Sequence, residues 1–164
     1  MMILKTAITD LDAVMAIYAC ARKYMRESGN ARQWGDDHPP KAFIEEDIRR
    51  GESYVCVDES GEIQAIFMLT QRPEPDYMKI DGAWVNDAPY TVIHRIARRR
   101  NAKGAGAFCL NWCYENFGNL RIDTHRDNAP MLKLLDNLGF VYCGVIWINI
   151  GGGERDERLA FQKA

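Results

Sequence analysis

The chain has 164 residues, of which 47% are hydrophobic and 27% are charged, so it can bury a core and is not globally disordered. This length fits one domain, and the formal net charge of −2 argues against non-specific binding to nucleic acid or an anionic membrane. No apolar run is long enough to span a bilayer, no signal peptide is evident, and five scattered cysteines complete no zinc-binding set. We expect a cytoplasmic protein with free thiols, no metal and a single domain over residues 1–164.

The first part of the chain predicts a strand followed by two helices. Residues 2–10 read as a short strand, and Thr9 can cap a helix whose apolar residues recur with helical spacing over 11–18. Glycines and prolines in 28–40 end this helix. Residues 41–50 have the pattern of a second, shorter helix that a glycine stops.

The middle of the chain predicts a hairpin, an irregular link, a strand and a helix. Two β-rich runs within 53–71 flank a turn of Asp, Glu, Ser and Gly, which is a hairpin signal. Residues 72–89 are proline-rich and polar and form an irregular link. Three β-branched residues favour a strand over 90–97, and apolar residues after Gly104 form one side of a helix that Gly118 ends.

The last part of the chain predicts a strand, a helix and two further strands. Residues 120–125 form the strand, and Asp127 or Asn128 caps a helix with a proline in its first turn and a full apolar stripe. Residues 140–150 and 157–163 are β-rich runs around a glycine turn. This alternation of elements predicts one mixed α/β domain.

The segment from Arg98 to Ala107 has the features of an anion site. A helix begins near Gly104 directly after a strand, so its first N–H groups lack an intrahelical partner and carry partial positive charge. Two glycines let a ligand approach the backbone, and three arginines and a lysine add charge. A glycine-tolerant turn beside a solvated basic face is the alternative. The P-loop pattern fails because Gly104 follows Lys103, and the dinucleotide pattern fails because its third glycine is Cys109.

This segment resembles the acetyl-CoA-binding motif of the GCN5-related N-acetyltransferase (GNAT) family. That motif, Gln/Arg-x-x-Gly-x-Gly/Ala, reads here as Asn101-Ala-Lys-Gly-Ala-Gly106 and departs only at its first position. The run "DNAPMLKLLDNLGF" resembles the family's second motif, an asparagine followed by an apolar helix that ends in Gly-Phe. With the order of elements, the resemblance covers nearly the whole chain. It implies an α/β (α+β) fold with a mixed, mostly antiparallel twisted sheet, splayed central strands and helices on both faces.

The resemblance implies that acetyl-CoA is a co-substrate and binds where the central strands part. Backbone groups of Ile96 and Ala97 would pair with the pantetheine arm, and backbone groups of the glycine loop would hold the pyrophosphate. Asn128 matches the asparagine that contacts the pantetheine region, with a simple helix cap as its other role. The expected cofactor-binding residues are Ile96, Ala97, Arg98, Lys103, Gly104, Ala105, Gly106, Ala107 and Asn128.

The implied reaction is direct attack of an amine on the thioester, for which a general base or a water relay is useful, and the thiolate leaves with a proton from an acid or with help from water. Many relatives carry a strand glutamate and a helix tyrosine, and the matching positions here are Tyr90 and Leu135. His94 shares a strand face with Tyr90 and is the first candidate base, unless it only hydrogen-bonds a neighbour. His125 is the second candidate. Tyr142 is the candidate acid, with a half-buried strand position as its alternative.

The acceptor pocket is expected from the loop after the first helix and from the link before residues 90–97. Aromatic and acidic side chains there suit a cationic amine, although packing and solvation are their alternative roles. The candidate substrate-binding residues are Trp34, Tyr77 and Trp84, accompanied by the acids Asp36, Asp37 and Glu74.

These observations favour an acetyl-CoA-dependent N-acetyltransferase that acts on a primary amine of a small molecule or peptide. Because the usual tyrosine and glutamate are missing, a non-catalytic acyl-CoA-binding or regulatory module is the alternative. An unrelated phosphate-binding α/β protein is a third hypothesis. Nucleic acid and membrane are not expected as partners, and the sequence allows a homodimer.

Overall fold

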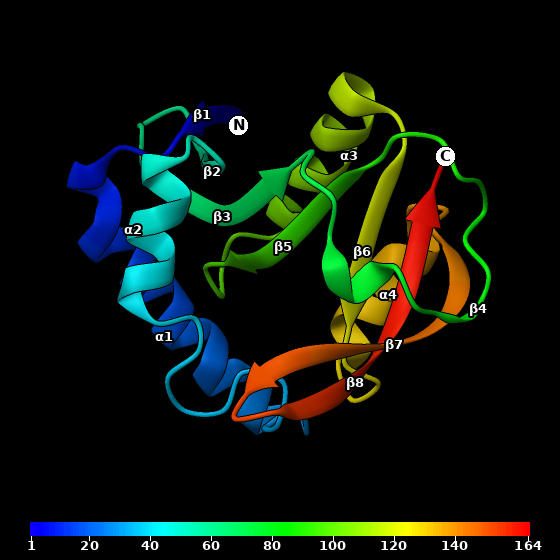
Figure 1. The fold of residues 1–164 in the computed structure, drawn as a ribbon. Helices are drawn as coiled ribbons and strands as arrows, with labels where there is room; N and C mark the ends of the chain where they lie inside the picture. Colours follow the sequence, from blue (N-terminus) through cyan, green and yellow to red (C-terminus); the bar gives the residue numbers. More distant parts are fainter.

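The structure is a computed structural model that describes residues 1–164, and its main elements follow the expected order (Figure 1). The helices are α1 (Leu11–Glu27), α2 (Lys41–Arg49), α3 (Ala105–Phe117) and α4 (Ala129–Asn137), with short 3-10 turns η1 (Ile8–Asp10) and η2 (Pro75–Tyr77). The strands are β1 (Met2–Lys5), β2 (Ser53–Val57), β3 (Ile63–Thr70), β4 (Asp81–Gly82), β5 (Thr91–Arg98), β6 (Leu120–Thr124), β7 (Val141–Gly151) and β8 (Glu154–Lys163). No helix combines the length and the apolar character needed to cross a membrane.

All the strands belong to one twisted sheet, in the order β1-β2-β3-β5-β6-β8-β7-β4. Every neighbouring pair is antiparallel except β5 and β6, which are parallel. The β5–β6 pairing runs only from Thr91 opposite Leu120 to Ile93 opposite Ile122, and the strands then separate. The expected splayed central strands are therefore confirmed, and the fold matches the α/β arrangement predicted above.

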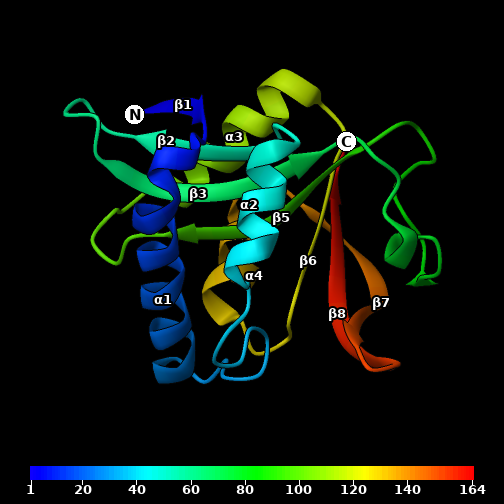
Figure 2. The same cartoon turned by 60° about the vertical axis from the view of Figure 1, so that its left-hand side comes forward.

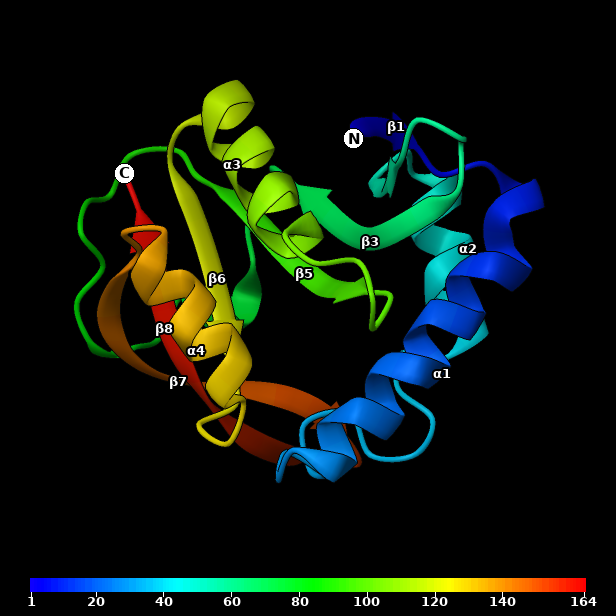
Figure 3. The same ribbon diagram turned by 180° about the vertical axis from the view of Figure 1, so that it is seen from behind.

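Helices cover both faces of the sheet because side chains on a strand point alternately to the two sides. Ile66 of β3 packs with α1 and α2, whereas the next residue, Phe67, packs with α3. Figure 2 shows α1 and α2 in front of β3 and β5, and Figure 3 shows α3 and α4 on the other side. The buried apolar residues of the helices are Leu11, Val14, Ile17, Tyr18, Ile44, Cys109, Leu110, Cys113 and Leu135.

The start of the chain differs from the expectation. The first strand ends at Lys5, and Thr9 lies inside η1, where it caps no helix. Instead, the backbone N–H of Ala7 donates to Oδ2 of Asp10 at 2.8 Å, and α1 begins at Leu11. A local hydrogen bond of this kind competes with regular strand structure, which explains why the strand is shorter than its apolar pattern.

The irregular link contains two elements that its proline-rich pattern did not predict. One is η2, and the other is the two-residue strand β4, which pairs with β7 at the edge of the sheet. Gly82 and Gly144 face each other there, and a Cβ atom on Gly144 would lie 2.1 Å from the carbonyl oxygen of Asp81. Because only glycines permit this close approach of two backbones, the pairing depends on residues far apart in the sequence.

Candidate active site

A cleft of about 1320 Å³ lies where β5 and β6 part. Its lining comes from α1, α2 and the loop between them, from β5 and the start of α3, and from the far end of the β7–β8 hairpin. In Figure 1 these segments form a ring around the centre of the molecule. Most of the candidate residues lie in this cleft, and they divide into groups at its two ends.

The start of α3 forms one end of the cleft. Gly104 caps α3 in the left-handed conformation, with φ of 79°, and it lines the cleft with Gly106 and Ala107. The N–H groups of these three residues donate to no acceptor within the chain. Free N–H groups at a helix N-terminus bind anions well. Lys103 and Ala105 do not line the cleft, because Lys103 points to solvent and Ala105 is buried in the core.

A bulge interrupts β5 at the point where it lines the cleft. Ile66 pairs with Ala97 and Met68 pairs with His94, so Arg95 and Ile96 together oppose one residue of β3. Arg95 has a φ of 52°, which is rare for a residue other than glycine. Two tertiary contacts hold it there. The Tyr18 hydroxyl donates to its carbonyl oxygen at 2.8 Å, and its guanidinium binds both carboxylate oxygens of Asp47.

The backbone of β5 beyond the bulge faces the gap. Ile96 and Ala97 line the cleft, as does Arg98, and β6 offers them no ladder partner because the two strands have already separated. Arg98 directs its Nη1 to the carbonyl oxygens of Arg99 and Arg100 at 2.9 and 2.8 Å. Its charge therefore stays close to the anion-binding end of the cleft.

His94 lies at the point where the strands part. Its Nε2 is 2.8 Å from Oε2 of Glu74, and its Nδ1 is 3.9 Å from Oδ2 of Asp123. The hydrogen bond and the charge of His94 lower the pKa of Glu74. Asp123 accepts a hydrogen bond at 2.6 Å from the hydroxyl of Tyr77, whose pKa is raised well above its usual value, chiefly by burial. An imidazole between two carboxylates is suited to take up a proton.

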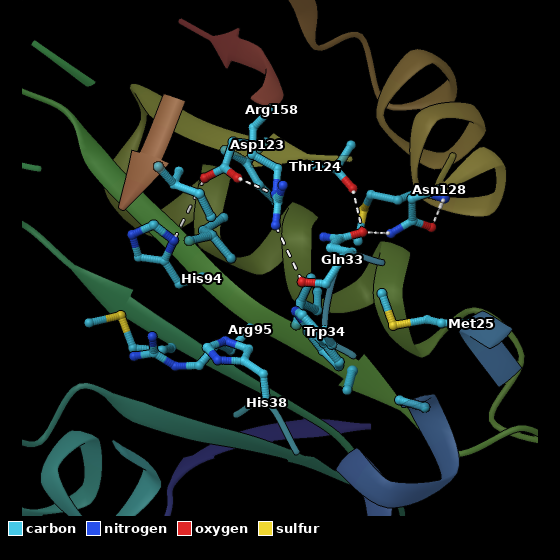
Figure 4. Close-up of a pocket in the computed structure, with 18 of the residues that line it drawn as sticks. Met25, Gln33, Trp34, His38, His94, Arg95, Asp123, Thr124, Asn128 and Arg158 are labelled. Carbon is cyan, nitrogen blue, oxygen red and sulfur yellow. Dashed lines mark hydrogen bonds and ion pairs between the residues drawn. The ribbon is translucent and has the colours of Figure 1, made fainter. Parts of the chain in front are cut away.

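A network centred on Gln33 crosses the cleft from the loop between α1 and α2 (Figure 4). Oε1 of Gln33 accepts from the Asn128 side chain at 3.0 Å, and its carbonyl oxygen accepts from Nη2 of Arg158 at 3.3 Å. Asn128 also caps α4, because its side chain accepts from the N–H of Met131 at 3.3 Å. No sequence pattern pointed to Gln33, whose partners lie about a hundred residues further along the chain.

Two of the three candidate catalytic residues lie outside the cleft. Tyr142 is 54% exposed and packs on Phe161, near the end of β7 that is remote from the cleft. The cleft begins at Ile148, which lies about 20 Å further along an extended strand. His125 is buried, and its Nδ1 accepts from the backbone N–H of Asp127 at 3.2 Å. These positions do not fit an acid or a base, so His94 is the candidate that remains.

The aromatic candidates divide in the same way. Trp34 and Tyr77 line the cleft, but Trp84 does not. Its ring packs 5.2 Å from that of Tyr77 and 4.1 Å from the guanidinium of Arg121. Trp84 therefore has the packing role that was its alternative interpretation.

Among the acids of the expected acceptor pocket, Asp37 and Glu74 line the cleft. Asp36 points to solvent, where it pairs with Arg26 at 3.1 Å. The structure contains no group of three or more His, Cys, Asp or Glu side chains placed to hold a metal ion.

The whole chain is similar to known acetyltransferase structures. A GNAT-family acetyltransferase from Streptococcus agalactiae is 28% identical and superposes with a TM-score of 0.85, covering 99% of this chain and 94% of that one. The chain belongs to the GNAT superfamily. No protein-family model matches the sequence, and no curated protein matches it.

Two more distant GNAT structures share the fold. A ribosomal-protein-alanine N-acetyltransferase from Brucella melitensis is 20% identical, with a TM-score of 0.64 and coverage of 99% of each chain. A phosphinothricin acetyltransferase from Sinorhizobium meliloti, determined in complex with acetyl-CoA, is 14% identical, with a TM-score of 0.65 and coverage of 99% of this chain and 86% of that one.

This GNAT chain uses the two usual catalytic positions for packing. Leu135, at the position of the helix tyrosine, is fully buried in the core beneath α4. Tyr90, at the position of the strand glutamate, lies 3.9 Å from the guanidinium of Arg121. Neither residue lines the cleft.

Proposed function

We propose that the protein is an acetyl-CoA-dependent N-acetyltransferase that transfers an acetyl group to a primary amine. The observation that supports this most is the position of the His94–Glu74 pair. It lies where β5 and β6 part, in the same cleft as the free N–H groups at the start of α3. One cleft thus offers an anion site at one end and a proton acceptor at the point where the strands separate.

The residues of the cleft fit acetyl-CoA, which when bound supplies an acetyl group as a thioester. The N–H groups of Gly104, Gly106 and Ala107 would hold its pyrophosphate, since they have no acceptor within the chain. The backbone of Ile96 and Ala97 would pair with the pantetheine arm, because it lies on the edge of β5 that β6 leaves free.

His94 would accept the proton of the attacking amine. Alkyl amines are mostly protonated near neutrality, and only the neutral form attacks. When Nε2 of His94 donates to Glu74, its Nδ1 carries the lone pair. The amine nitrogen then bonds to the acetyl carbon, the C–S bond breaks and the amine proton passes to His94. The carboxylates of Glu74 and Asp123 stabilise the resulting imidazolium. The departing thiolate takes a proton from water, and the water regains one from His94, which returns to its neutral form.

A second candidate function is a non-catalytic acyl-CoA-binding module. It is favoured by the packing roles of Leu135 and Tyr90, which leave the chain without the family's usual acid and base. Both candidates predict acetyl-CoA binding, and only the first predicts turnover.

The test is incubation with acetyl-CoA and a panel of primary amines, with free thiol as the readout and calorimetry for acetyl-CoA binding. Binding together with amine-dependent thiol release supports the N-acetyltransferase. Binding without thiol release for any amine favours the non-catalytic module. Absence of both contradicts the whole assignment of the cleft.

A further inference from the structure

Three arginines from neighbouring elements line the part of the cleft beyond His94. Arg50 follows α2, Arg72 follows β3, and Arg95 forms the bulge of β5. None of them belongs to the start of α3, and Arg95 directly follows His94 in β5. The mechanism proposed above assigns none of them a role.

Each of these arginines is paired with a carboxylate that is less exposed than the arginine. The Arg72 side chain is 54% exposed, whereas its partner Glu52 is 15% exposed. The side chains of Arg95 and its partner Asp47 are 17% and 9% exposed, and the Arg50 side chain is likewise more exposed than that of its partner Glu46. Glu46 and Glu52 do not line the cleft, whereas Asp47 does, so this side of the cleft presents three guanidinium groups and one carboxylate.

The pairs also leave part of each guanidinium free. Arg72 and Arg95 use Nε and Nη2 to bind their carboxylates, and the Nη1 of each has no hydrogen-bond partner in the chain. Arg50 uses only Nε. The paired carboxylates hold the guanidiniums in place, which lowers the entropy cost of binding an anion with the free N–H groups.

The opposite wall of this part of the cleft is acidic. Glu74 and Asp76 lie at η2, and Asp76 accepts from the backbone N–H of Asn149 at 3.1 Å. The two walls meet at β5, because Glu74 contacts His94 at 2.8 Å and the next residue of the strand is Arg95. A ligand in this space meets hydrogen-bond donors on one side and carboxylates on the other.

We propose that the acceptor is a zwitterion of the α-amino acid type. Its amine would lie at His94 and Glu74. Its carboxylate would bind the free N–H groups of the three arginines, Arg50, Arg72 and Arg95. This inference rests on the proposed function and narrows its acceptor from any primary amine to one with an adjacent acidic group. Figure 4 shows His94 and Arg95, which are consecutive in β5, in this cleft.

Apolar side chains complete the space and suggest which amino acids to use as probes. The ring of His38 lies between those of Trp34 and Phe43, and all three side chains line the cleft. Phe43 is half exposed although it is aromatic, and Met68 lies on the β3 side. An apolar amino-acid side chain fits such a wall.

The experiment compares each amino acid with the amine that lacks only its carboxylate. The pairs are L-phenylalanine with 2-phenylethylamine, L-leucine with 3-methylbutylamine, and L-methionine with 3-(methylthio)propylamine. Calorimetry in the presence of CoA reads binding without turnover, and thiol release from acetyl-CoA reads kcat/KM. We expect at least one amino acid to exceed its amine about 10- to 100-fold in both measurements, which is the contribution of charge-assisted hydrogen bonds.

Two neighbouring arginines supply a matched control. Arg50 lines the cleft and Arg49 does not, although both pair with Glu46. Arg72→Gln and Arg50→Gln should reduce the preference for the amino acid over its amine, and Arg49→Gln should leave it unchanged.

The inference is overturned if the amines equal or exceed the amino acids in every pair, or if amino-acid amides and peptides are preferred. Those results would leave the proposed acetyl transfer intact. If no acceptor leads to thiol release, the proposed function fails. The calorimetric comparison of amino acids with amines then still tests whether the cleft prefers zwitterions. Absence of amino-acid binding in that case overturns the inference as well.

Discussion

Nε2 of His94 lies 2.8 Å from Oε2 of Glu74, and the two residues reach this contact from different segments. His94 is in β5, and Glu74 directly precedes η2, 20 residues earlier in the chain. The hydrogen bond and the charge of His94 lower the pKa of Glu74, so its carboxylate is ionised near neutrality and orients the imidazole. Glu74 is thus a positioning residue for the candidate base.

Replacement of His94 by Gln should reduce kcat by about 10²- to 10⁴-fold, because a general base contributes an acceleration of this order. The affinity for acetyl-CoA should not change, since the free N–H groups at the start of α3 remain. Thiol release at saturating acetyl-CoA gives kcat, and calorimetry gives the affinity. Tyr142→Phe is the control and should have wild-type kcat, because Tyr142 lies outside the cleft. A wild-type kcat for His94→Gln would exclude His94 as the base.

The parts of the site that depend on nearby residues were predictable from the sequence. The free N–H groups follow from a glycine at the start of a helix, and Asn128 caps α4 because it precedes an apolar helix with a proline in its first turn. His94 was located from the alternation of side chains in a strand, although the alternation could not tell which residue it contacts.

The parts that depend on long-range pairing were not predictable. Glu74 lies 20 residues before His94, and Gln33 lies 95 residues before Asn128, so no local pattern indicates either contact. Tyr142 was misplaced for a similar reason. Its distance from the cleft depends on the register in which β7 pairs with β8, which decides which end of β7 lies at the cleft.

Gly104→Val should abolish acetyl-CoA binding, whereas Gly118→Val should not. Both glycines have positive φ, 79° and 70°, and neither has a neighbouring atom within 4 Å of the position that a Cβ atom would occupy. Both substitutions should destabilise the fold by about 1–3 kcal/mol or more. Gly118→Val should cost more than Gly104→Val, because Gly104 is left-handed whereas Gly118 combines a φ of 70° with a ψ of −102°. Only Gly104 lines the cleft. Calorimetry with acetyl-CoA and urea unfolding of both variants test this, and equal affinities would contradict the assignment of the loop.

Asn128 has two roles that two substitutions can separate. Asn128→Ala removes the side-chain acceptor of the Met131 N–H and should cost about 1 kcal/mol of stability. Asn128→Asp keeps that acceptor but loses the donor to Oε1 of Gln33. It should retain most of the stability yet weaken the tie across the cleft. Urea unfolding measures the stability, and amide hydrogen exchange in residues 28–40 measures the tie. Unchanged exchange in Asn128→Asp would show that this hydrogen bond does not hold the loop.

The pH dependence of stability should carry a contribution from His38. Burial, followed by the charges of Arg95 and Arg158, lowers the pKa of His38 from 6.5 to about 4. The unfolded chain therefore binds this proton more tightly than the folded one. The cost to folding is absent above pH 6.5, grows as the pH falls and is complete below about pH 4. Allowing for partial exposure, it amounts to about 1–2 kcal/mol.

His38→Gln should remove this contribution and leave the titration of the carboxylates in place. Urea unfolding at about pH 7.5 and about pH 4.5 gives the loss of stability for each protein. The loss should be smaller in the variant, by about 1 kcal/mol, because glutamine does not titrate. Parallel losses in the two proteins would mean that His38 is protonated as readily in the folded chain as in the unfolded one. Its burial between Trp34 and Phe43 would then not persist in solution.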